Sequence, residues 1–191
     1  MRSQLLTVAL LVIAPLALQA DEKQKVAKET EEAKTVLIGA QAPVFKIKDA
    51  EGNEINLAKL TNKGPVLVRL TCGCSGCDKE LAYFQALDKA YEGKGLTSLA
   101  IFREPDEKVE AYVKEKKLKM LYAVDTKGES WKVFQTKTMP TNFLIEKGGK
   151  IRSIAAGCDP SGLLANKVSE KVAALLETDN VDVKEKVASK K

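Results

Sequence analysis

The stretch PVLVRLTCGCSGCDKEL, residues 65–81, contains three of the four cysteines of this 191-residue chain. Residues 65–71 are largely apolar, which predicts a strand in the middle of a sheet. A helix-like run starts near Asp78, so Cys74 and Cys77 form a Cys-x-x-Cys pair at a strand-to-helix junction. A helix N-terminus stabilises a thiolate, and the spacing lets one sulfur reach the other across a single helical turn. The pair is therefore expected to cycle between dithiol and disulfide.

The segments around this stretch alternate between strand and helix patterns. Strands are expected at 65–71, 96–102 and 118–124, hairpins at 44–57 and 142–155, and helices from 78, 105, 129 and 160, the last ending at 176. Strand-helix-strand-helix followed by an antiparallel hairpin and a helix predicts an α/β fold with a mixed sheet.

The first twenty residues have the pattern of a cleaved secretory signal peptide. Arg2 precedes an almost wholly apolar run, and Ala20 stands just before a charged segment. An uncleaved N-terminal anchor is the alternative, but the run is short for a membrane span, which needs about 20 residues. We expect an exported protein, periplasmic or otherwise extracytoplasmic, with no stable membrane span after cleavage.

The mature chain is expected to contain one domain between two charged segments. Residues 21–36 predict a solvated linker and residues 177–191 a charged, disordered tail. The 140 or so residues between them, 37–176, suit a single hydrophobic core. We expect a monomer.

Composition narrows the chemistry. The net charge of +5 arises from 31 basic and 26 acidic residues of interspersed sign, which argues against a nucleic-acid surface. Histidine is absent, which excludes Cys–His catalysis and mixed His/Cys metal sites. Cys72, Cys74 and Cys77 are too close together to staple distant segments, and a chain of about 170 residues can bury a sufficient core without such disulfides. The cysteine cluster is therefore predicted to take part in a reaction rather than to form structural disulfides. No metal or other cofactor is expected.

Four stretches between residues 38 and 176 resemble the thioredoxin-like superfamily, in particular its exported TlpA/ResA-like and alkyl hydroperoxide reductase/thiol-specific antioxidant (redoxin) branch. They are IGAQAPVF at 38–45 followed by Asp49-x-x-Gly52, CSGCDKEL at 74–81, TMPTNFLI at 138–145 and the turn at 147–151. The resemblance implies a thioredoxin-like fold: a central mixed β-sheet flanked by helices, with an extra N-terminal β-hairpin.

The resemblance also assigns roles. Cys74 would attack a substrate disulfide, and Cys77 would resolve the mixed disulfide. Pro140 would be cis and would hold Met139 beside the sulfurs, which leaves backbone groups free to pair with an extended substrate segment. The partners would be protein thiols and disulfides, together with an unidentified electron-transfer partner.

Several nearby residues have two interpretations. Glu80 would tune the acidity of Cys77 or relay protons to it. Alternatively, it would only interact favourably with the helix dipole as an acidic residue of the first turn. Arg69 would lower the pKa of the sulfurs if it lay near them, but a solvent-facing side chain at a strand end is the favoured interpretation. Trp131 and Phe134 are expected in the core.

Cys72, Cys158 and Gly73 depart from the usual pattern of the family. Gly73 replaces a tryptophan, which predicts a more open site. The resemblance places Cys158 in the loop after the last strand, at the active-site end of the sheet, so that all four cysteines would converge. Cys72 and Cys158 would then form a second disulfide, remain independent thiols, or join the other two in binding a soft metal such as Cu(I) or Zn.

The predicted function is an exported thiol–disulfide oxidoreductase that exchanges electrons with protein disulfides. The first alternative is a thiol peroxidase in which Cys77 attacks peroxide, because residues 77–80 fit a Cys-x-x-Glu motif. Against it, Cys74 replaces the threonine of that motif. The second alternative is a soft-metal-binding thioredoxin-like module, which depends on convergence of the four cysteines.

Overall fold

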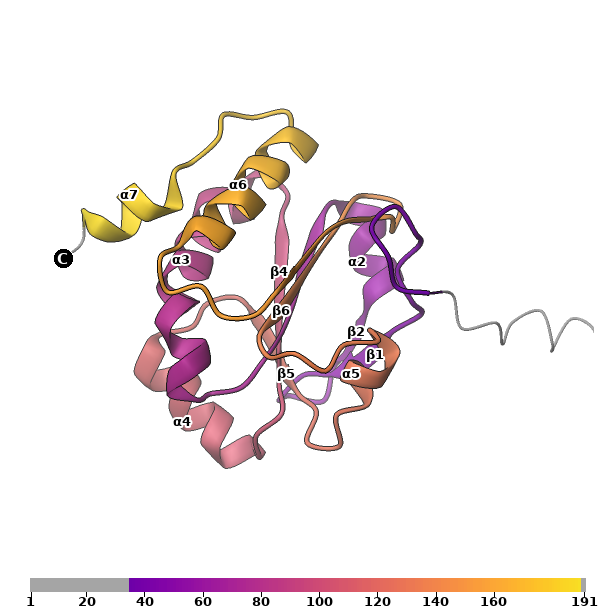
Figure 1. Ribbon diagram of the computed structural model, residues 1–191. Coiled ribbons are helices and arrows are strands. Elements are labelled where there is room, and N and C mark those ends of the chain that lie inside the picture. The colour runs from indigo at the N-terminus through magenta and orange to yellow at the C-terminus, as the bar shows by residue number, and fades with distance from the viewer. Residues whose placement is uncertain (1–34, 190–191) are drawn as a thin grey trace, which may run out of the picture. The chain divides into compact units, whose positions relative to one another are not determined.

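The computed structural model describes residues 35–189 (Figure 1). The predicted signal peptide and the linker up to residue 34 lie outside the described residues. Val36 is only 9% exposed and packs in the core, and its N–H donates a hydrogen bond to Gln135 Oε1 at 3.1 Å. The packed domain therefore begins slightly before the predicted boundary at residue 37.

The central sheet has five strands in the order β5-β4-β3-β6-β7. Strands β3, β4 and β5 are parallel, whereas β6 runs antiparallel to β3 and β7 antiparallel to β6. The strands are β3 (Val66–Thr71), β4 (Thr97–Phe102), β5 (Leu121–Val124), β6 (Thr141–Ile145) and β7 (Ile151–Ala156). The predicted mixed sheet is confirmed, and β3, which precedes the cysteines, is its central strand.

A separate antiparallel hairpin and the helices cover the sheet. The hairpin pairs β1 (Lys46–Lys48) with β2 (Glu54–Asn56), as predicted. The helices are α2 (Leu57–Lys63), α3 (Ser75–Tyr91) followed by the 3₁₀ turn η1 (Glu92–Lys94), α4 (Asp106–Lys116), α5 (Glu129–Val133), α6 (Leu163–Leu175) and α7 (Val183–Ala188). Within residues 35–189, no helix is both long and apolar enough to cross a membrane.

The two faces of the sheet have different covers. Figure 1 shows α3, α4 and α6 on one side of the strands, and α2, α5 and the β1–β2 hairpin on the other. Successive side chains of a strand point to opposite faces. Val66, Val68 and Leu70 of β3 accordingly pack with the hairpin side, whereas Leu67 packs with α3 and α6. Arg69 follows the alternation of Leu67 and so faces the α3 side.

Two element boundaries differ from the sequence expectation. Helix α3 begins at Ser75 with Cys74 as its N-cap, three residues before the expected start at Asp78, so Cys77 lies in its first turn. Helix α2 occupies the end of the expected hairpin, and its N-cap Asn56 accepts a hydrogen bond from Lys59 N–H at 3.3 Å. An asparagine in this position is a preferred helix start, and this signal was missed.

Trp131 and Phe134 are core residues, as predicted, with 5% and 1% of their surface exposed. The Phe134 ring lies between Phe45 and Phe143, with centroid distances of 5.4 Å and 4.8 Å. This aromatic cluster joins α5 to the hairpin and to β6, which closes the hairpin side of the core.

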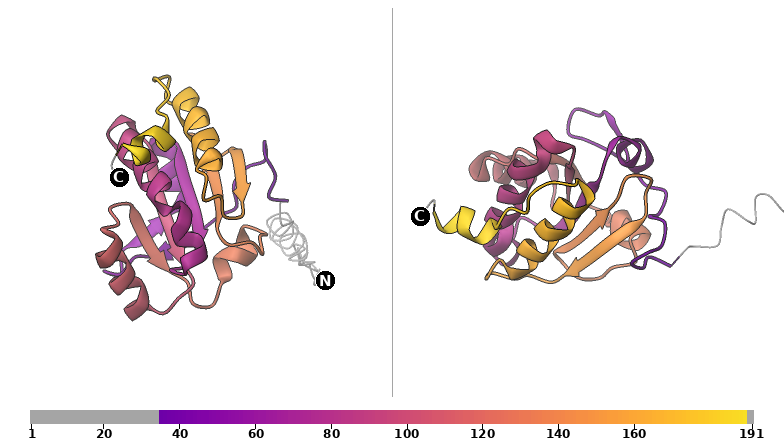
Figure 2. Two further views of the ribbon diagram at one scale, coloured as in Figure 1. Left: turned by 60° about the vertical axis from the view of Figure 1, so that its left-hand side comes forward. Right: turned by 90° about the horizontal axis from the view of Figure 1, so that it is seen from above.

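The prediction of a disordered tail at 177–191 is wrong for residues 177–189. Figure 2 shows α7 folded back beside α3 and α6. Val183 is fully buried, and the Val181 N–H donates a hydrogen bond to Tyr91 Oη at 2.9 Å. The Ser169 hydroxyl donates to the Val181 carbonyl at 2.7 Å. The charged side chains of this segment face solvent, whereas its spaced valines pack against α3 and α6. The segment is therefore amphipathic, which its polar composition alone did not indicate.

Replacing Val183 by alanine should lower the free energy of unfolding by about 1–3 kcal/mol, because it removes buried methyl groups and leaves a cavity. Chemical denaturation measures this change. Lys186→Ala, on the exposed side of the same helix, should stay within about 0.5 kcal/mol of the original protein. Equal and negligible effects of the two substitutions would show that the tail does not pack.

Candidate active site

Cys74 lies at the N-terminus of α3, directly after the turn that follows β3. It is the N-cap residue, its side chain is exposed, and its carbonyl oxygen accepts a hydrogen bond from Asp78 N–H at 3.0 Å. The unpaired N–H groups of the first turn and the helix dipole favour a negative charge here. The sulfur predicted to attack is therefore both accessible and placed where a thiolate is stabilised.

Cys77 lies in the first turn of the same helix but is buried, with 3% of its surface exposed. Its Sγ lies 3.1 Å from the Sγ of Cys72, which is also buried. The sulfurs of Cys72, Cys74 and Cys77 all lie within 4.8 Å of one another, and all three are free thiols. The structure thus brings the predicted pair together with Cys72 in one cluster, which we call the three-sulfur cluster.

The thiols of this cluster differ in acidity. The pKa of Cys74 is lowered, first by a hydrogen bond from the Cys72 thiol and then by the backbone N–H of Cys77. Burial raises the pKa of the Cys72 thiol well above its ordinary value. Because the thiolate is the attacking form, Cys74 is the favoured nucleophile and Cys72 keeps its proton.

A buried ion pair lies next to Cys77. Arg69 donates through Nη1 to Glu80 Oε1 at 2.7 Å, and both side chains are at most 2% exposed. Arg69 Nη2 donates to the Cys77 carbonyl at 3.3 Å, and the guanidinium lies 4.6 Å from the Phe84 ring centroid. The interpretation of Arg69 as a solvent-facing residue is therefore wrong, and Glu80 is the fixed partner of a buried cation.

The same ion pair joins three elements. Arg69 Nη1 also donates to Asn142 Oδ1 on β6 at 2.9 Å, and Asn142 Nδ2 donates to the Ala155 carbonyl on β7 at 3.4 Å. The second oxygen of Glu80 accepts a hydrogen bond from Asp159 N–H, in the loop after β7, at 2.8 Å. Helix α3, strand β6 and that loop are thus held to one another through two charged side chains.

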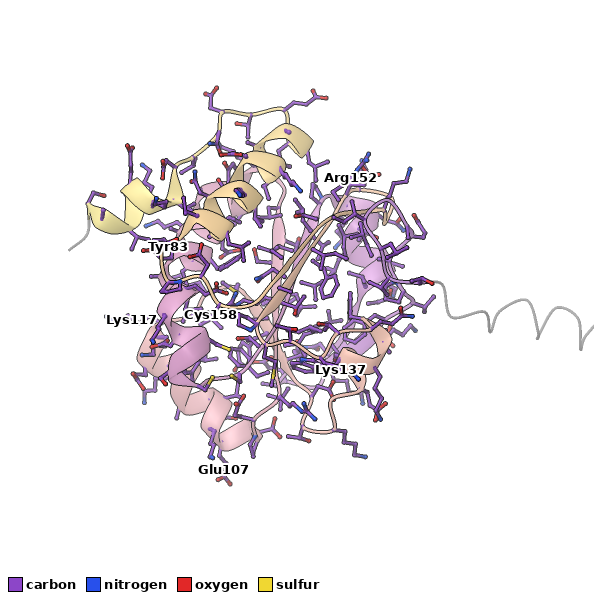
Figure 3. All side chains as sticks on the ribbon, in the orientation of Figure 1. Tyr83, Glu107, Lys117, Lys137, Arg152 and Cys158 are labelled. Carbon is purple, nitrogen blue, oxygen red and sulfur yellow. The ribbon has the colours of Figure 1, made fainter. Side chains whose placement is uncertain are left out.

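Cys158 lies in the loop between β7 and α6 (Figure 3). Its predecessor Gly157 donates through N–H to the Pro140 carbonyl at 2.8 Å, and its successor Asp159 is held by Glu80. The Cys158 thiol donates to the Gly76 carbonyl at 2.8 Å. Cys158 therefore lies beside the Cys-x-x-Cys segment, as predicted, in a loop that is anchored on both sides.

The Cys158 sulfur is nevertheless not part of the three-sulfur cluster, which contains only Cys72, Cys74 and Cys77. The near partner of Cys72 is Cys77, and Cys158 is exposed. Partial desolvation of the sulfur and the nearby Glu80 carboxylate raise the pKa of the Cys158 thiol. This arrangement supports neither a Cys72–Cys158 disulfide nor a four-thiolate metal site.

The Met139–Pro140 peptide bond is cis, as the resemblance implied. Pro140 is buried, whereas Met139 is 36% exposed. They precede β6, the strand that carries Asn142. The hydrogen bond from Gly157 N–H to the Pro140 carbonyl ties this segment to the Cys158 loop.

Gly73 lies against Tyr112 in the wall of a hollow beside Cys74. A Cβ at position 73 would lie 3.3 Å from the ring of Tyr112 on α4, and the Tyr112 hydroxyl donates to Asp78 Oδ1 at 2.9 Å. A cavity of about 250 Å³ is lined by Gly73, Cys74, Glu104, Lys108, Val109 and Tyr112. A hollow therefore adjoins Cys74 on the α4 side, and whether the site is more open than in relatives with a tryptophan at this position stays a prediction.

Sequence reasoning missed three residues of this region: Asn142, Tyr112 and Asp159. The burial of Arg69 did have a signal in the sequence. Arg69 is a lone charge within an apolar strand and alternates with Val68 and Leu70, so its side chain points to the opposite face of the sheet. Asn142 and Asp159 gave no local signal, because their roles depend on the packing of β6 and the β7–α6 loop against α3.

The fold and this site define a thioredoxin-like protein with a Cys-x-x-Cys dithiol at the N-terminus of a helix. Residues 38–154 match the AhpC/TSA family, and the chain belongs to that family.

Relatives and solved structures agree with this assignment. The chain is 37% identical over 115 residues to thiol-disulfide oxidoreductase ResA of Bacillus thuringiensis subsp. konkukian, a match that covers 60% of this chain and 66% of the relative. It is 30% identical over 165 residues to sporulation thiol-disulfide oxidoreductase A of Bacillus subtilis, covering 81% and 90%. Both relatives are named as thiol–disulfide oxidoreductases, and this chain spans slightly less than two thirds of the length of the first.

Structural similarity supports the fold. The crystal structure of a putative thiol:disulfide interchange protein DsbE from Chlorobium tepidum aligns with a TM-score of 0.67 at 22% identity. The alignment covers 74% of this chain and 99% of that one. The predicted thioredoxin-like architecture is confirmed.

Replacing Cys72 by alanine should shift the alkylation of Cys74 to higher pH. The substitution removes the hydrogen bond that contributes most to the lowered pKa of Cys74, so less thiolate exists at neutral pH. The rate of iodoacetamide labelling at Cys74, followed by mass spectrometry across a pH series, should show a midpoint below that of an ordinary thiol in the original protein and a higher midpoint in the variant.

Cys158→Ala is the control for this measurement, because the Cys158 thiol contacts the Gly76 carbonyl and not the Cys74 sulfur. It should leave the Cys74 midpoint in place. A midpoint that does not rise in Cys72→Ala would mean that Cys72 does not influence the acidity of Cys74.

Proposed function

We propose that this protein is an exported thiol–disulfide oxidoreductase in which Cys74 exchanges with disulfides of other proteins and Cys77 completes the exchange. The observation that carries the proposal is the contrast within one helical turn: an exposed Cys74 of lowered pKa and a buried Cys77, with their sulfurs within 4.8 Å. Such a pair lets an external disulfide reach only the first sulfur.

The reaction begins with the Cys74 thiolate. It attacks one sulfur of a substrate disulfide, the substrate S–S bond breaks, and the other substrate sulfur leaves as a thiolate that takes up a proton. The Cys77 thiol then gives up its proton and attacks the Cys74 sulfur. The second substrate sulfur leaves, so the substrate gains two electrons and the protein holds a Cys74–Cys77 disulfide. The reverse sequence oxidises a dithiol.

The segment around the cis bond would receive the substrate chain. Met139 is partly exposed next to the buried Pro140, and the cavity beside Gly73 lies next to Cys74. An extended substrate segment would contact Met139, and a substrate side chain would enter the cavity. Glu80 serves as a positioning residue, since its two oxygens are occupied by Arg69 and Asp159.

Export is proposed from the N-terminal sequence. The apolar run between Arg2 and Ala20 has the length and flanks of a secretory signal. Exchange of disulfides also suits an oxidising compartment. The partners would be protein thiols and disulfides and a separate electron-transfer protein, and we expect a monomer.

The peroxidase alternative is less well supported by the geometry. Cys77 would have to attack peroxide, yet it is 3% exposed and its sulfur lies against that of Cys72. The glutamate of the Cys-x-x-Glu motif, Glu80, is held by Arg69. The soft-metal alternative needed four converging sulfurs, and Cys158 lies outside the three-sulfur cluster.

Trapping tests the proposal directly. The variant with Cys72→Ala and Cys77→Ser lacks both thiols near Cys74, so reduced protein exposed to oxidised glutathione should accumulate a glutathione mixed disulfide on Cys74. The Cys72→Ala variant should instead form an internal Cys74–Cys77 disulfide and carry no glutathione on Cys74, which mass spectrometry of the peptide 70–79 distinguishes.

The matched control replaces Cys72 by alanine and Cys74 by serine, which leaves only the buried thiol of the pair. Its Cys77 thiol should react far more slowly with oxidised glutathione than Cys74 does in the first variant. Faster adduct formation in this control than in the Cys77→Ser variant would reverse the assigned roles and favour Cys77 as the primary nucleophile.

A further inference from the structure

Cys77 contacts a sulfur that lies outside the Cys-x-x-Cys pair. Cys72 Sγ lies 3.1 Å from Cys77 Sγ, and both residues are buried. A disulfide bond is about 2.05 Å long, so these sulfurs need to approach by roughly 1 Å to bond. Cys77 therefore has two potential partners, exposed Cys74 on one side and buried Cys72 on the other.

We propose that Cys72 is a third redox-active residue. It attacks Cys77 in the Cys74–Cys77 disulfide, so that the oxidised protein holds a buried Cys72–Cys77 disulfide and a free Cys74 thiol. This inference rests on the proposed function, which supplies the Cys74–Cys77 disulfide. The contact between the two buried sulfurs and the closeness of all three carry it.

The step is an internal thiol–disulfide exchange. The Cys72 sulfur attacks the Cys77 sulfur, the Cys74–Cys77 bond breaks, and a Cys72–Cys77 bond forms. The Cys74 sulfur leaves as a thiolate, and the proton of Cys72 passes to it along the Cys72–Cys74 hydrogen bond or to solvent. One S–S bond replaces another, so no electrons are gained or lost and no further reagent is required.

The surroundings of the sulfurs favour this direction. The better leaving group is the thiol of lower pKa, and that thiol is Cys74, at the helix N-terminus. The reverse step would expel a Cys72 thiolate into a buried site, where desolvation disfavours the charge. The exchange therefore replaces a disulfide that includes exposed Cys74 by one between two buried cysteines, and it leaves Cys74 as an exposed free thiol.

The consequence is a second activity of the oxidised protein. With Cys74 free, the oxidised form can still attack a disulfide of a substrate protein. A thiol released in that substrate then attacks the mixed disulfide and expels Cys74 again. Substrate disulfides are rearranged with no net oxidation, so the oxidised protein would act as a disulfide isomerase on polypeptides that contain several cysteines.

Differential labelling of the oxidised protein tests the assignment. The full mature chain is oxidised with oxidised glutathione, quenched with acid, and its free thiols are labelled with N-ethylmaleimide before reduction and labelling with iodoacetamide. Trypsin releases residues 70–79 as one peptide with all three cysteines, and fragmentation of that peptide locates each label.

We expect maleimide on Cys74 in most of the oxidised peptide, with Cys72 and Cys77 carrying the second label. In Cys72→Ala the exchange is impossible, so Cys74 and Cys77 should both carry the second label. Cys158→Ala, which removes a thiol outside the three-sulfur cluster, should give the pattern of the original protein.

Maleimide mainly on Cys72 would overturn this inference but leave the proposed function intact, because it indicates a Cys74–Cys77 disulfide. Maleimide on all three cysteines would overturn both, because no internal disulfide had formed. The isomerase activity has its own readout. Oxidised protein should reactivate scrambled ribonuclease A without added thiol, and Cys72→Ala should lose most of this activity. Equal reactivation by the two proteins would contradict the role of Cys72.

Discussion

The buried ion pair between Arg69 and Glu80 is the constraint on which the rest of the site depends. Taking two charges out of water is costly, and a buried pair often stabilises a fold no better than apolar residues of similar size. Its value here is positional. Arg69 donates hydrogen bonds to the Cys77 carbonyl in the first turn of α3 and to Asn142 on β6. Glu80 accepts a hydrogen bond from Asp159 N–H in the β7–α6 loop. Each of these contacts would be lost or left uncompensated if one charge were missing.

This arrangement gives each sulfur a different chemistry. Cys74 is set at the exposed helix N-terminus, where hydrogen bonds lower the pKa of its thiol. Cys77 is held one turn further in by the Arg69 contact to its carbonyl, and Cys72 is buried against it. In the proposed reaction, access and acidity select Cys74 as the attacking sulfur, and proximity selects Cys77 as the resolving one. The ion pair does not itself take part in bond exchange, but it fixes the distances over which exchange occurs.

The sequence predicted what depends on local pattern. The Cys74–Cys77 pair, the central strand and both hairpins were expected from the sequence pattern and are present in the structure. The cis bond before Pro140 was implied by the family resemblance and is also present. What it could not supply depends on packing between distant segments. The burial of Arg69 requires α3 to lie across β3, and the docking of the segment around Val183 requires α3 and α6 to be in place. The contact of Cys72 with Cys77 rather than Cys158 depends on how the segment before α3 and the β7–α6 loop pack against that helix.

The most direct test of this account removes the ion pair without leaving a lone buried charge. Arg69→Met with Glu80→Leu, made together with Cys72→Ala and Cys158→Ala, retains only the Cys74–Cys77 pair and is expected to stay folded. Reduced protein is mixed with 5,5′-dithiobis(2-nitrobenzoate), and the release of nitrothiobenzoate is followed in time. The first release, by Cys74, should proceed within about twofold of the rate in protein that keeps the ion pair. The second release, by Cys77, is intramolecular and should slow by about tenfold or more, because a misplacement of about 1 Å is costly for such a step. A second release that keeps its rate would contradict the claim that Arg69 and Glu80 position the sulfurs.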